Sequence, residues 1–296
     1  MKKLRVKKKI SFWLNELLFV GPIFLVFIII KIWPLFLEIY YSFLDWNGVS
    51  DIKEWVGFAN YLKLWTDSSF TNSLIFTAKY MVVVVIASNV IAFSLAYALS
   101  KPLRARNLMR AGFFLPYTLG GLVLGYIWSF IFTIVFPKIG ELTGIGIFSL
   151  PWIGSSTMGF WALAVVETWR FMGYLMLLYI AGLTTVPAEC IEAATVDGAG
   201  KLRILRNITL PLIMPTITRC TFLSILTASR IFEINLALTN GGPYRSTEAL
   251  VFNIYQTAFK QTEMGYGSAK ALIYLLIIVI ISLVQVYFTS KKEVEL

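Results

Sequence analysis

The chain has 296 residues, of which 58% are apolar, 16% aromatic and only 14% charged, and its formal net charge is +10. Soluble domains are about 45–50% apolar and about 25% charged, so this composition excludes an ordinary soluble enzyme and a disordered chain. A membrane span takes about 20 apolar residues, and the length therefore allows roughly six to eight spans with little aqueous mass.

Taken in chain order, the apolar runs predict an all-α membrane protein with six spans. The runs cover approximately residues 17–42, 72–99, 108–134, 158–182, 211–238 and 266–289. The first run is too long for a secretory signal peptide and lacks a small-residue cleavage site, so we interpret it as a span. We expect a single six-span domain over 17–290, preceded by a basic segment (1–16) and followed by a short tail (291–296).

The basic residues mark one side of the membrane. More than half of the Lys and Arg lie in the first 16 residues, in two short loops (101–110 and 201–206) and in the tail. The intervening polar stretches lean acidic, so basic and acidic loops alternate. The positive-inside rule then predicts a multi-pass cell-membrane protein with both termini in the cytoplasm. The net charge therefore reflects topology, and we expect no nucleic-acid partner.

Several kinds of chemistry are missing from the chain. It contains no His, and its two Cys, Cys190 and Cys220, lie far apart, so no zinc site and no catalytic residue is predicted. The stretch Ala199-Gly200-Lys201 does not complete a phosphate-binding loop, because Thr195 and Leu202 stand where Gly and Ser or Thr are required. We therefore expect ATP to be bound by another chain.

The loop 187–211 differs from the others because it mixes acids, bases and apolar residues at helical spacing. Its small apolar positions are Ala188, Ile191, Ala194 and Ala199. Glu189, Glu192 and Asp197 are expected to be more exposed, and Gly198 and Gly200 to end the helix. Two interpretations stand: a helix that docks on a partner, or a membrane-surface helix that merely connects two spans.

This loop resembles the signature of permease subunits of binding-protein-dependent ABC importers, which is Glu-Ala-Ala, three residues, Gly, nine residues, Ile, one residue, Leu-Pro. The matching residues here are Glu192, Ala193, Ala194, Gly198, Ile208, Leu210 and Pro211. Further matches to the sugar branch are Phe114–Tyr117 with Gly125–Trp128, Leu238–Pro243 with Ser246–Glu248, and Tyr255–Phe259, which extend the resemblance over roughly 70–290. The chain looks like the first-type subunit of maltose, oligosaccharide and glycerol-phosphate importers, since it lacks the Gly-Ala-Val-Lys-Gly-like tail of the second type.

The resemblance implies a mechanism and a set of partners. The loop would form a coupling helix in a groove of a cytoplasmic ATPase, with Glu192 paired to a basic residue, Asp197 beside it and Gly198 allowing a sharp exit. The partners would be a second, similar permease subunit, two ATPase subunits that hold ATP and Mg, and an extracellular sugar-binding protein. The chain itself would bind no cofactor and catalyse no covalent step, its work being alternating access.

Charged residues inside the predicted spans indicate a cavity or a partner. Glu167 and Arg170, and likewise Arg230 and Glu233, are three residues apart and suit intrahelical ion pairs. In sugar permeases of this type, the fourth and fifth spans line the substrate cavity. The resemblance therefore suggests these pathway residues: Tyr117, Gly121, Glu167, Phe171, Tyr174, Ser224, Thr227, Ala228 and Ile231. Rings stack on sugars and polar groups bond to hydroxyls, although plain core packing is an equal alternative for Phe171 and Ile231.

Two rival classes stay open. A proton- or sodium-driven carrier would need inverted repeats and broken half-helices. A membrane enzyme would need a polar catalytic cluster near an interface. The sequence shows no such repeat and no matched catalytic motif, and the signature loop favours the importer. Which sugar is carried, from a disaccharide to glycerol phosphate, stays open, because Ala228 and Ile231 stand where some relatives have amides.

Overall fold

The structure is a computed structural model that describes residues 18, 20–101 and 103–291. It consists of two compact units, which are described separately. The smaller unit comprises Met1–Thr66 and Ile254–Ile273, and the larger comprises Asp67–Asn253 and Tyr274–Leu296.

The smaller unit contains a long helix, a two-stranded sheet and a short helix. Its elements are η1 (Ile28–Ile32), α2 (Trp33–Ser42), β1 (Leu44–Asp45), β2 (Glu54–Trp55), α3 (Ala59–Leu64) and η5 (Gln256–Lys260). The strands are antiparallel, with Leu44 opposite Trp55. Gly265 lies against this sheet, because a Cβ at that position would collide with the carbonyl of Leu44.

The larger unit holds most of the helices. In order they are α4 (Ser68–Leu99), α5 (Arg106–Thr118), α6 (Gly121–Phe130), η2 (Ile131–Val135), α7 (Phe136–Thr143), η3 (Gly146–Ser149), α8 (Ser156–Leu183), α9 (Ala188–Val196), α10 (Lys201–Ile204), η4 (Leu205–Thr209), α11 (Leu210–Leu212), α12 (Met214–Ser229) and α13 (Glu233–Leu238). Two further helices, α14 (Leu250–Tyr255) and α15 (Met264–Ser290), belong to it in part.

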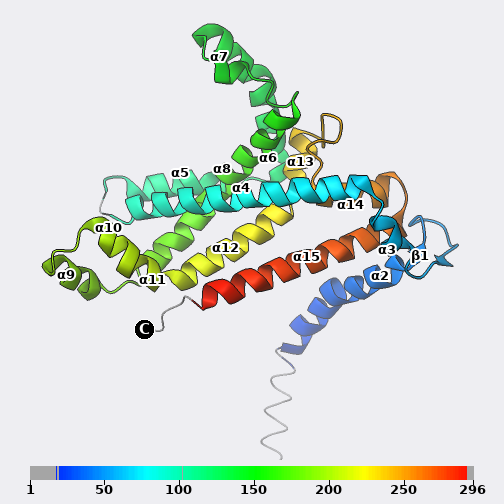
Figure 1. The fold of residues 1–296 in the computed structure, drawn as a ribbon, viewed down its shortest axis with the longest axis horizontal. Helices are drawn as coiled ribbons and strands as arrows, with labels where there is room; N and C mark the ends of the chain where they lie inside the picture. Colours follow the sequence, from blue (N-terminus) through cyan, green and yellow to red (C-terminus); the bar gives the residue numbers. More distant parts are fainter. Residues whose placement is uncertain (1–17, 19, 102, 292–296) are drawn as a thin grey trace, which may run out of the picture. The chain divides into compact units, whose positions relative to one another are not determined.

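The core of the larger unit forms where α4, α5 and α12 pack around α8 (Figure 1). Small residues allow the close approach, since Ala92 and Ala96 on α4 are fully buried against large side chains such as Leu175 of α8. At Gly173, a Cβ would collide with the carbonyl of Phe113 on α5. Small residues at helix contacts are typical of membrane bundles, where backbones pack closely.

The expected all-α architecture of membrane spans is confirmed. In the part of the chain that the structure describes, five helices are long and apolar enough to cross a bilayer: Val20–Ser42, Ser68–Leu99, Gly121–Thr143, Ser156–Leu183 and Met264–Ser290. A sixth span results if Lys201–Leu212 and Met214–Ser229, which meet at 72°, are counted together.

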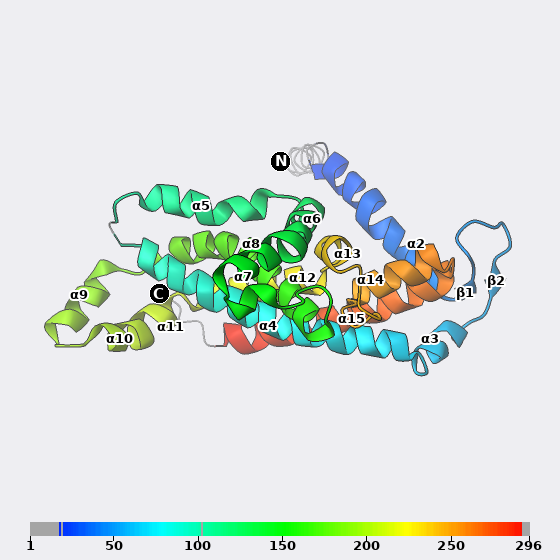
Figure 2. The ribbon, with the colours of Figure 1, turned by 90° about the horizontal axis from the view of Figure 1, so that it is seen from above.

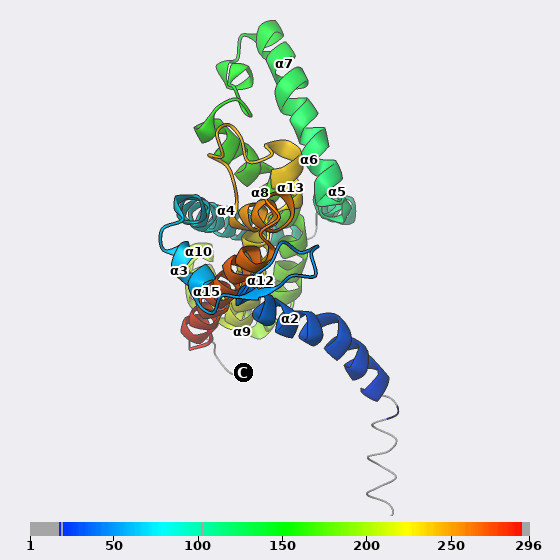
Figure 3. The same ribbon diagram turned by 90° about the vertical axis from the view of Figure 1, so that its right-hand side faces the viewer.

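The third span is not the continuous helix predicted over 108–134. Helix α5 ends at Thr118, and Leu119 and Gly120 are extended before α6 begins. Pro116 lies in the last turn of α5 and cannot donate a backbone hydrogen bond, which weakens the helix at this point. The apolar helix then continues to Thr143, and α6, η2 and α7 form one rod (Figure 3).

The fifth span is also shorter than the predicted 211–238. Helix α12 ends at Ser229, and the backbone leaves the helical region at Arg230 and Phe232. The Tyr274 hydroxyl donates a 2.8 Å hydrogen bond to the Ser229 carbonyl, which satisfies one of the acceptors freed at the helix end. The apolar run continues only because α13 is itself buried against α6.

Three wide, π-helical turns precede prolines. They are Ile28–Ile32, Ile131–Val135 and Leu205–Thr209, and Pro34, Pro137 and Pro211 follow each by two residues. A proline ring clashes with the carbonyl four residues earlier and removes one donor. An extra residue in the turn relieves that clash while the helix continues.

Candidate functional site

Helix α9, which forms the first part of loop 187–211, is exposed along most of its length. None of its residues is buried, and Val196 in its last turn is 87% exposed. It lies, with α10, beyond the end of α4 that carries Leu99 (Figure 2). The short helix expected in loop 187–211 is therefore present, and Glu192 and Ala193 are on its open surface while Ala194 is half-buried.

The end of α9 is fixed by Gly198. Its φ of +81° lies in the left-handed region, which glycine adopts without strain. The Gly198 amide donates to the Thr195 carbonyl at 3.1 Å, and the Ala199 amide donates to the Ala194 carbonyl at 2.9 Å. These two bonds form a Schellman motif, which satisfies carbonyls at the helix end. Asp197 is the C-cap residue of the same turn.

After this turn the chain returns toward the bundle. Gly200 is the N-cap residue of α10, which continues through η4 into α11. Thr209 at the end of η4 is buried, and Leu210 and Pro211 in α11 are half-buried. The segment then meets α12 at the 72° bend. The loop thus consists of an exposed helix attached to a span through a short, bent helical segment.

A polar cavity of about 340 Å³ lies elsewhere in the larger unit. It is lined by Gly121, Glu167, Arg170, Thr227, Arg230, Ile231, Phe232, Glu233 and Ile234. Four of the predicted pathway residues meet here, namely Gly121, Glu167, Thr227 and Ile231. Gly121 is close to the opposite wall, since a Cβ there would lie 3.1 Å from the Glu233 Cβ.

The charge in this cavity is organised by one ion pair. Arg170 donates to both carboxylate oxygens of Glu167, at 2.6 and 3.2 Å, and the Glu167 side chain is only 3% exposed. The predicted pairing on α8 is therefore confirmed. Within the described residues no ion pair joins Arg230 to Glu233, because α12 ends at Ser229 and the two residues no longer share one helix.

Three predicted aromatic residues form a cluster beside the cavity. Tyr117 stacks on Tyr174 with ring centroids 4.6 Å apart, and Phe171 lies within 6 Å of both rings. The Arg170 guanidinium is 6.0 Å from the Tyr117 ring centre, which connects the cluster to the ion pair. Phe171 is 2% exposed and also belongs to the core, as the packing alternative predicts.

The remaining pathway candidates lie away from the cavity lining. Ser224 accepts a 2.8 Å hydrogen bond from the Asn89 amide, and Asn89 in turn accepts one from the Tyr179 hydroxyl at 2.7 Å. Ala228 is completely buried. These contacts join α4, α8 and α12 into one polar-centred core.

The cavity lining also includes five residues that are absent from the predicted pathway set: Arg170, Arg230, Phe232, Glu233 and Ile234. Charged residues within an apolar run were the available signal, and for Arg230 and Glu233 that signal is visible in the sequence. Their convergence depends on the break after α12, which spacing on a continuous helix does not predict. No group of three His, Cys, Asp or Glu side chains within the described ranges has a geometry suited to a metal ion.

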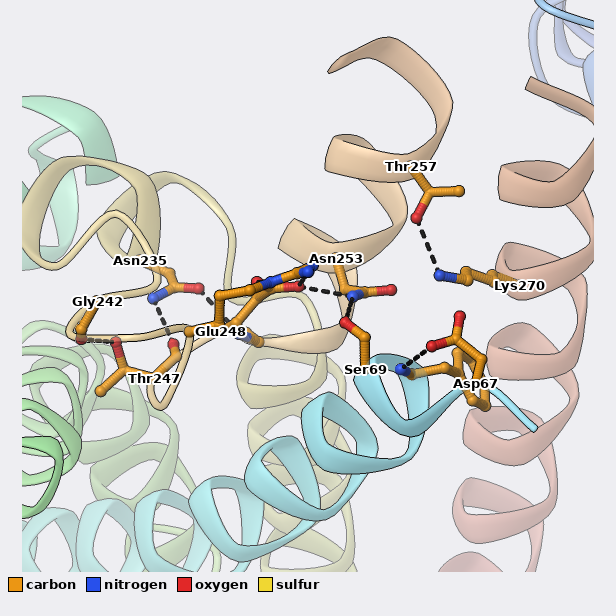
Figure 4. Close-up of polar contacts among 12 residues, drawn as sticks. Asp67, Ser69, Asn235, Gly242, Thr247, Glu248, Asn253, Thr257 and Lys270 are labelled. Atoms are coloured by element: carbon orange, nitrogen blue, oxygen red, sulfur yellow. Dashed lines mark hydrogen bonds and ion pairs between the residues drawn. The ribbon is translucent and has the colours of Figure 1, made fainter. Parts of the chain in front are cut away.

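A second polar cluster shapes the segment between α13 and α14 (Figure 4). The Asn235 side chain donates to the Thr247 carbonyl at 2.8 Å and accepts from the Ala249 amide at 3.0 Å. The Thr247 hydroxyl donates to the Gly242 carbonyl at 2.6 Å. This part of the chain was matched in the sequence only as a motif, without a role.

The same cluster contains a second buried carboxylate. Glu248 accepts from Arg245 through both oxygens and from the Asn253 amide at 2.6 Å, and Asn253 also bonds to Ser69 on α4. The hydrogen bonds to Glu248 raise the pKa of Arg245, so the guanidinium stays charged.

In the smaller unit, the Lys270 ammonium donates a hydrogen bond to the Thr257 hydroxyl at 2.9 Å, which Figure 4 also shows.

Comparison with known proteins identifies the family. Residues 88–294 match the model of the binding-protein-dependent transport system inner membrane component. The chain belongs to this family. As a member of this family, and with its apolar helices, the chain is a multi-pass inner membrane protein and a transport permease.

Individual relatives of this permease match along nearly its whole length. It is 43% identical over 292 residues to the probable starch degradation products transport system permease protein AmyD of Thermoanaerobacterium thermosulfurigenes, covering 98% of this chain and 99% of the relative. It is 31% identical to the multiple sugar-binding transport system permease protein MsmF of Streptococcus mutans, covering 88% and 90%.

The fold of the permease is also that of a solved transporter. A bacterial ABC transporter that imports the acidic polysaccharide alginate is similar with a TM-score of 0.83 over 97% of this chain and 99% of that chain, at 17% identity. A second structure of the bacterial alginate transporter, in complex with alginate pentasaccharide-bound periplasmic protein, has a TM-score of 0.79, with 94% of each chain covered.

Proposed function

We propose that this chain is one transmembrane subunit of an ATP-driven importer for a di- or oligosaccharide that an extracellular binding protein delivers. The carbohydrate class is supported by the similarity to AmyD and MsmF, which extends over almost the whole chain. The cavity suits such a substrate, because a compensated ion pair and Thr227 offer hydrogen bonds beside the aromatic cluster of Tyr117 and Tyr174.

The observation that carries the coupling mechanism is the state of α9. It is a preformed helix with no buried residue, in a chain that has no phosphate-binding loop. We infer that separate cytoplasmic ATPase subunits, which hold ATP and Mg, cover this helix. The acidic side chain of Glu192 would pair with a basic residue of the ATPase. Gly198 would let the chain turn sharply at the end of α9, so that the whole helix can contact the ATPase.

The transport step follows from the bent helices on either side of the cavity. Movement of α9 would reach α12 through the bent segment 201–212, and α12 ends where the cavity begins. A second, similar permease subunit would complete the pathway. Each state exposes the cavity to one side, and ATP binding changes the relative stability of the two states. In this arrangement both termini and loop 187–211 face the cytoplasm.

The test is ATP-dependent uptake of a labelled maltooligosaccharide by the reconstituted importer. Replacing a buried, paired charge typically weakens an interface by about 2 kcal/mol or more, so Glu192→Ala should reduce uptake roughly tenfold or more. Glu189→Ala is the matched control, because Glu189 is equally on the surface of α9 but outside the signature; it should stay within about twofold of wild type.

Two results would contradict this proposal. Uptake that is unchanged in Glu192→Ala would remove the coupling role of α9. Uptake that proceeds without ATP and follows a proton or sodium gradient would instead establish an ion-driven carrier.

A further inference from the structure

The segment between α13 and α14 presents one aromatic side chain to the outside. Tyr244 is 101% exposed, which makes it the most exposed large apolar side chain among the described residues. It lies next to Pro243 and Arg245, at the tip of the loop 240–248, which is called the outer loop below. A fully exposed ring gains nothing from packing within this chain.

The backbone of the outer loop is strained. Tyr244 and Arg245 have φ values of +51° and +62°, and Asn240 has +48°. For residues other than glycine this left-handed region is sterically unfavourable, because Cβ comes close to the following carbonyl oxygen. Such conformations persist only where the surrounding structure imposes them, and they concentrate at functional sites.

The structure that holds Tyr244 and Arg245 in this conformation is the polar cluster around Asn235 and Glu248. The Thr247 amide donates to the Gly241 carbonyl at 3.1 Å, which closes the base of the loop. The Arg245 guanidinium is held by both oxygens of Glu248, whose side chain is 4% exposed. Helix α8 supports the loop as well, since a Cβ at Gly159 would lie 2.9 Å from the Thr247 methyl group. The chain thus holds Tyr244 outward at a cost in backbone strain.

We propose that Tyr244 is the anchor residue through which this subunit docks the extracellular substrate-binding protein. The inference rests on the proposed function, which supplies that partner and places the outer loop across the membrane from α9, at the other end of α12. Tyr and Arg are enriched among residues that dominate binding energy at protein interfaces. A loop already fixed in its bound shape loses little entropy on docking.

The alternative to a protein partner is that the Tyr244 ring contacts the lipid headgroups. A membrane-anchoring Tyr needs only to lie at headgroup depth, and it does so from an ordinary helix or loop. It has no need of two consecutive left-handed residues or of a buried carboxylate beneath the tip. The half-exposed arginine at the same tip, which is 53% exposed, also suits a protein surface better than an acyl boundary.

The experiment uses the complete importer in nanodiscs, with both permease subunits and the ATPases, and titrates the purified, sugar-loaded binding protein. The readout is the concentration that gives half-maximal ATPase stimulation. Because a few anchor residues carry most of the binding energy at protein interfaces, Tyr244→Ala should raise that concentration roughly tenfold. Tyr244→Phe should retain most of the affinity, and the ATPase rate without binding protein should be unchanged.

Trp65→Ala is the matched control, since Trp65 is 88% exposed but lies at the end of α3, outside the strained loop. It should leave the half-maximal concentration within about twofold of wild type. An equal shift in Trp65→Ala would overturn the assignment, as would no shift in Tyr244→Ala. A shift that vanishes when the nanodisc lipid is changed would make Tyr244 a lipid anchor instead.

The failure of the proposed function would look different. Wild-type importer that takes up sugar while Tyr244→Ala behaves as wild type overturns only the docking role. Wild-type importer that fails to take up sugar under ATP overturns the proposed function, and the docking role with it.

Discussion

Loop 187–211, our proposed coupling loop, and the outer loop 240–248 are both exposed and contain left-handed residues, yet they are stabilised in opposite ways. The coupling loop depends on local backbone hydrogen bonds, and α9 has no buried residue. The outer loop depends on side chains from distant segments, because Asn235, Asn253 and Glu248 are all nearly fully buried. A helix held by local bonds alone gains no stability from burial within this chain, whereas a loop above a buried scaffold does.

The largest expected effect is on the scaffold of the outer loop. Asn235→Leu would leave the Thr247 carbonyl and the Ala249 amide without their side-chain partner, and each such buried group costs about 1–3 kcal/mol. The purified importer should therefore unfold at a clearly lower temperature in a thermal scan. Asn240→Gly is the control, since it removes an exposed side chain at a φ of +48° and should be neutral. Equal melting temperatures for the two variants would mean that the buried scaffold does not stabilise the outer loop.

The coupling loop should respond to backbone conformation alone. Gly198 and Gly200 both have open space around them, but Gly198 has a φ of +81° and Gly200 has −69°. Gly198→Ser should cost about 1–2 kcal/mol at the helix end and reduce ATP-driven uptake roughly tenfold. Gly200→Ser should be tolerated, because serine is a favoured N-cap residue. If both variants transport equally, the Schellman turn has no role in coupling.

A smaller effect is expected at the ion pair beneath the outer loop. Arg245→Lys keeps the charge but loses the two-pronged bond to Glu248, and since Arg245 is half-exposed the loss should be about 1 kcal/mol or less. The melting temperature should fall slightly. Lys138→Ala, which removes a pair exposed at both ends, should produce no change. A large drop in Arg245→Lys would mean that the pair, rather than Asn235, supports the loop.

The sequence predicted the helical class and the exposed helix of loop 187–211 correctly, and its six spans agree with the structure when the bent pair Lys201–Leu212 and Met214–Ser229 is counted as one span. Spans are recognisable because the bilayer demands a long apolar run whatever the tertiary structure. The turn after α9 is recognisable because glycine adopts its left-handed φ without strain, and Gly198 stands at the required position. Both features are local, so a local pattern is sufficient to find them.

The breaks in the third and fifth spans were missed for a physical reason. Hydropathy measures burial, and the residues after each break are as apolar as those before it, because α6 and α13 are packed against each other. At Gly125 a Cβ would lie 2.6 Å from the Ala237 Cβ, so these helices meet through small residues far apart in sequence. The cavity is lined by residues of both α6 and α13, which this contact brings together. The sequence therefore predicted its lining only in part.

The three wide turns before prolines affect how faces are assigned along the helices. Each turn inserts one residue into a helix that otherwise advances about 100° per residue, so everything beyond it is rotated by about that amount. The apolar pattern of Leu202 and Leu205 therefore does not continue in phase past Thr209. In this permease the side of α10 that stays exposed and the side of α11 that faces the bundle are therefore set independently by one extra residue.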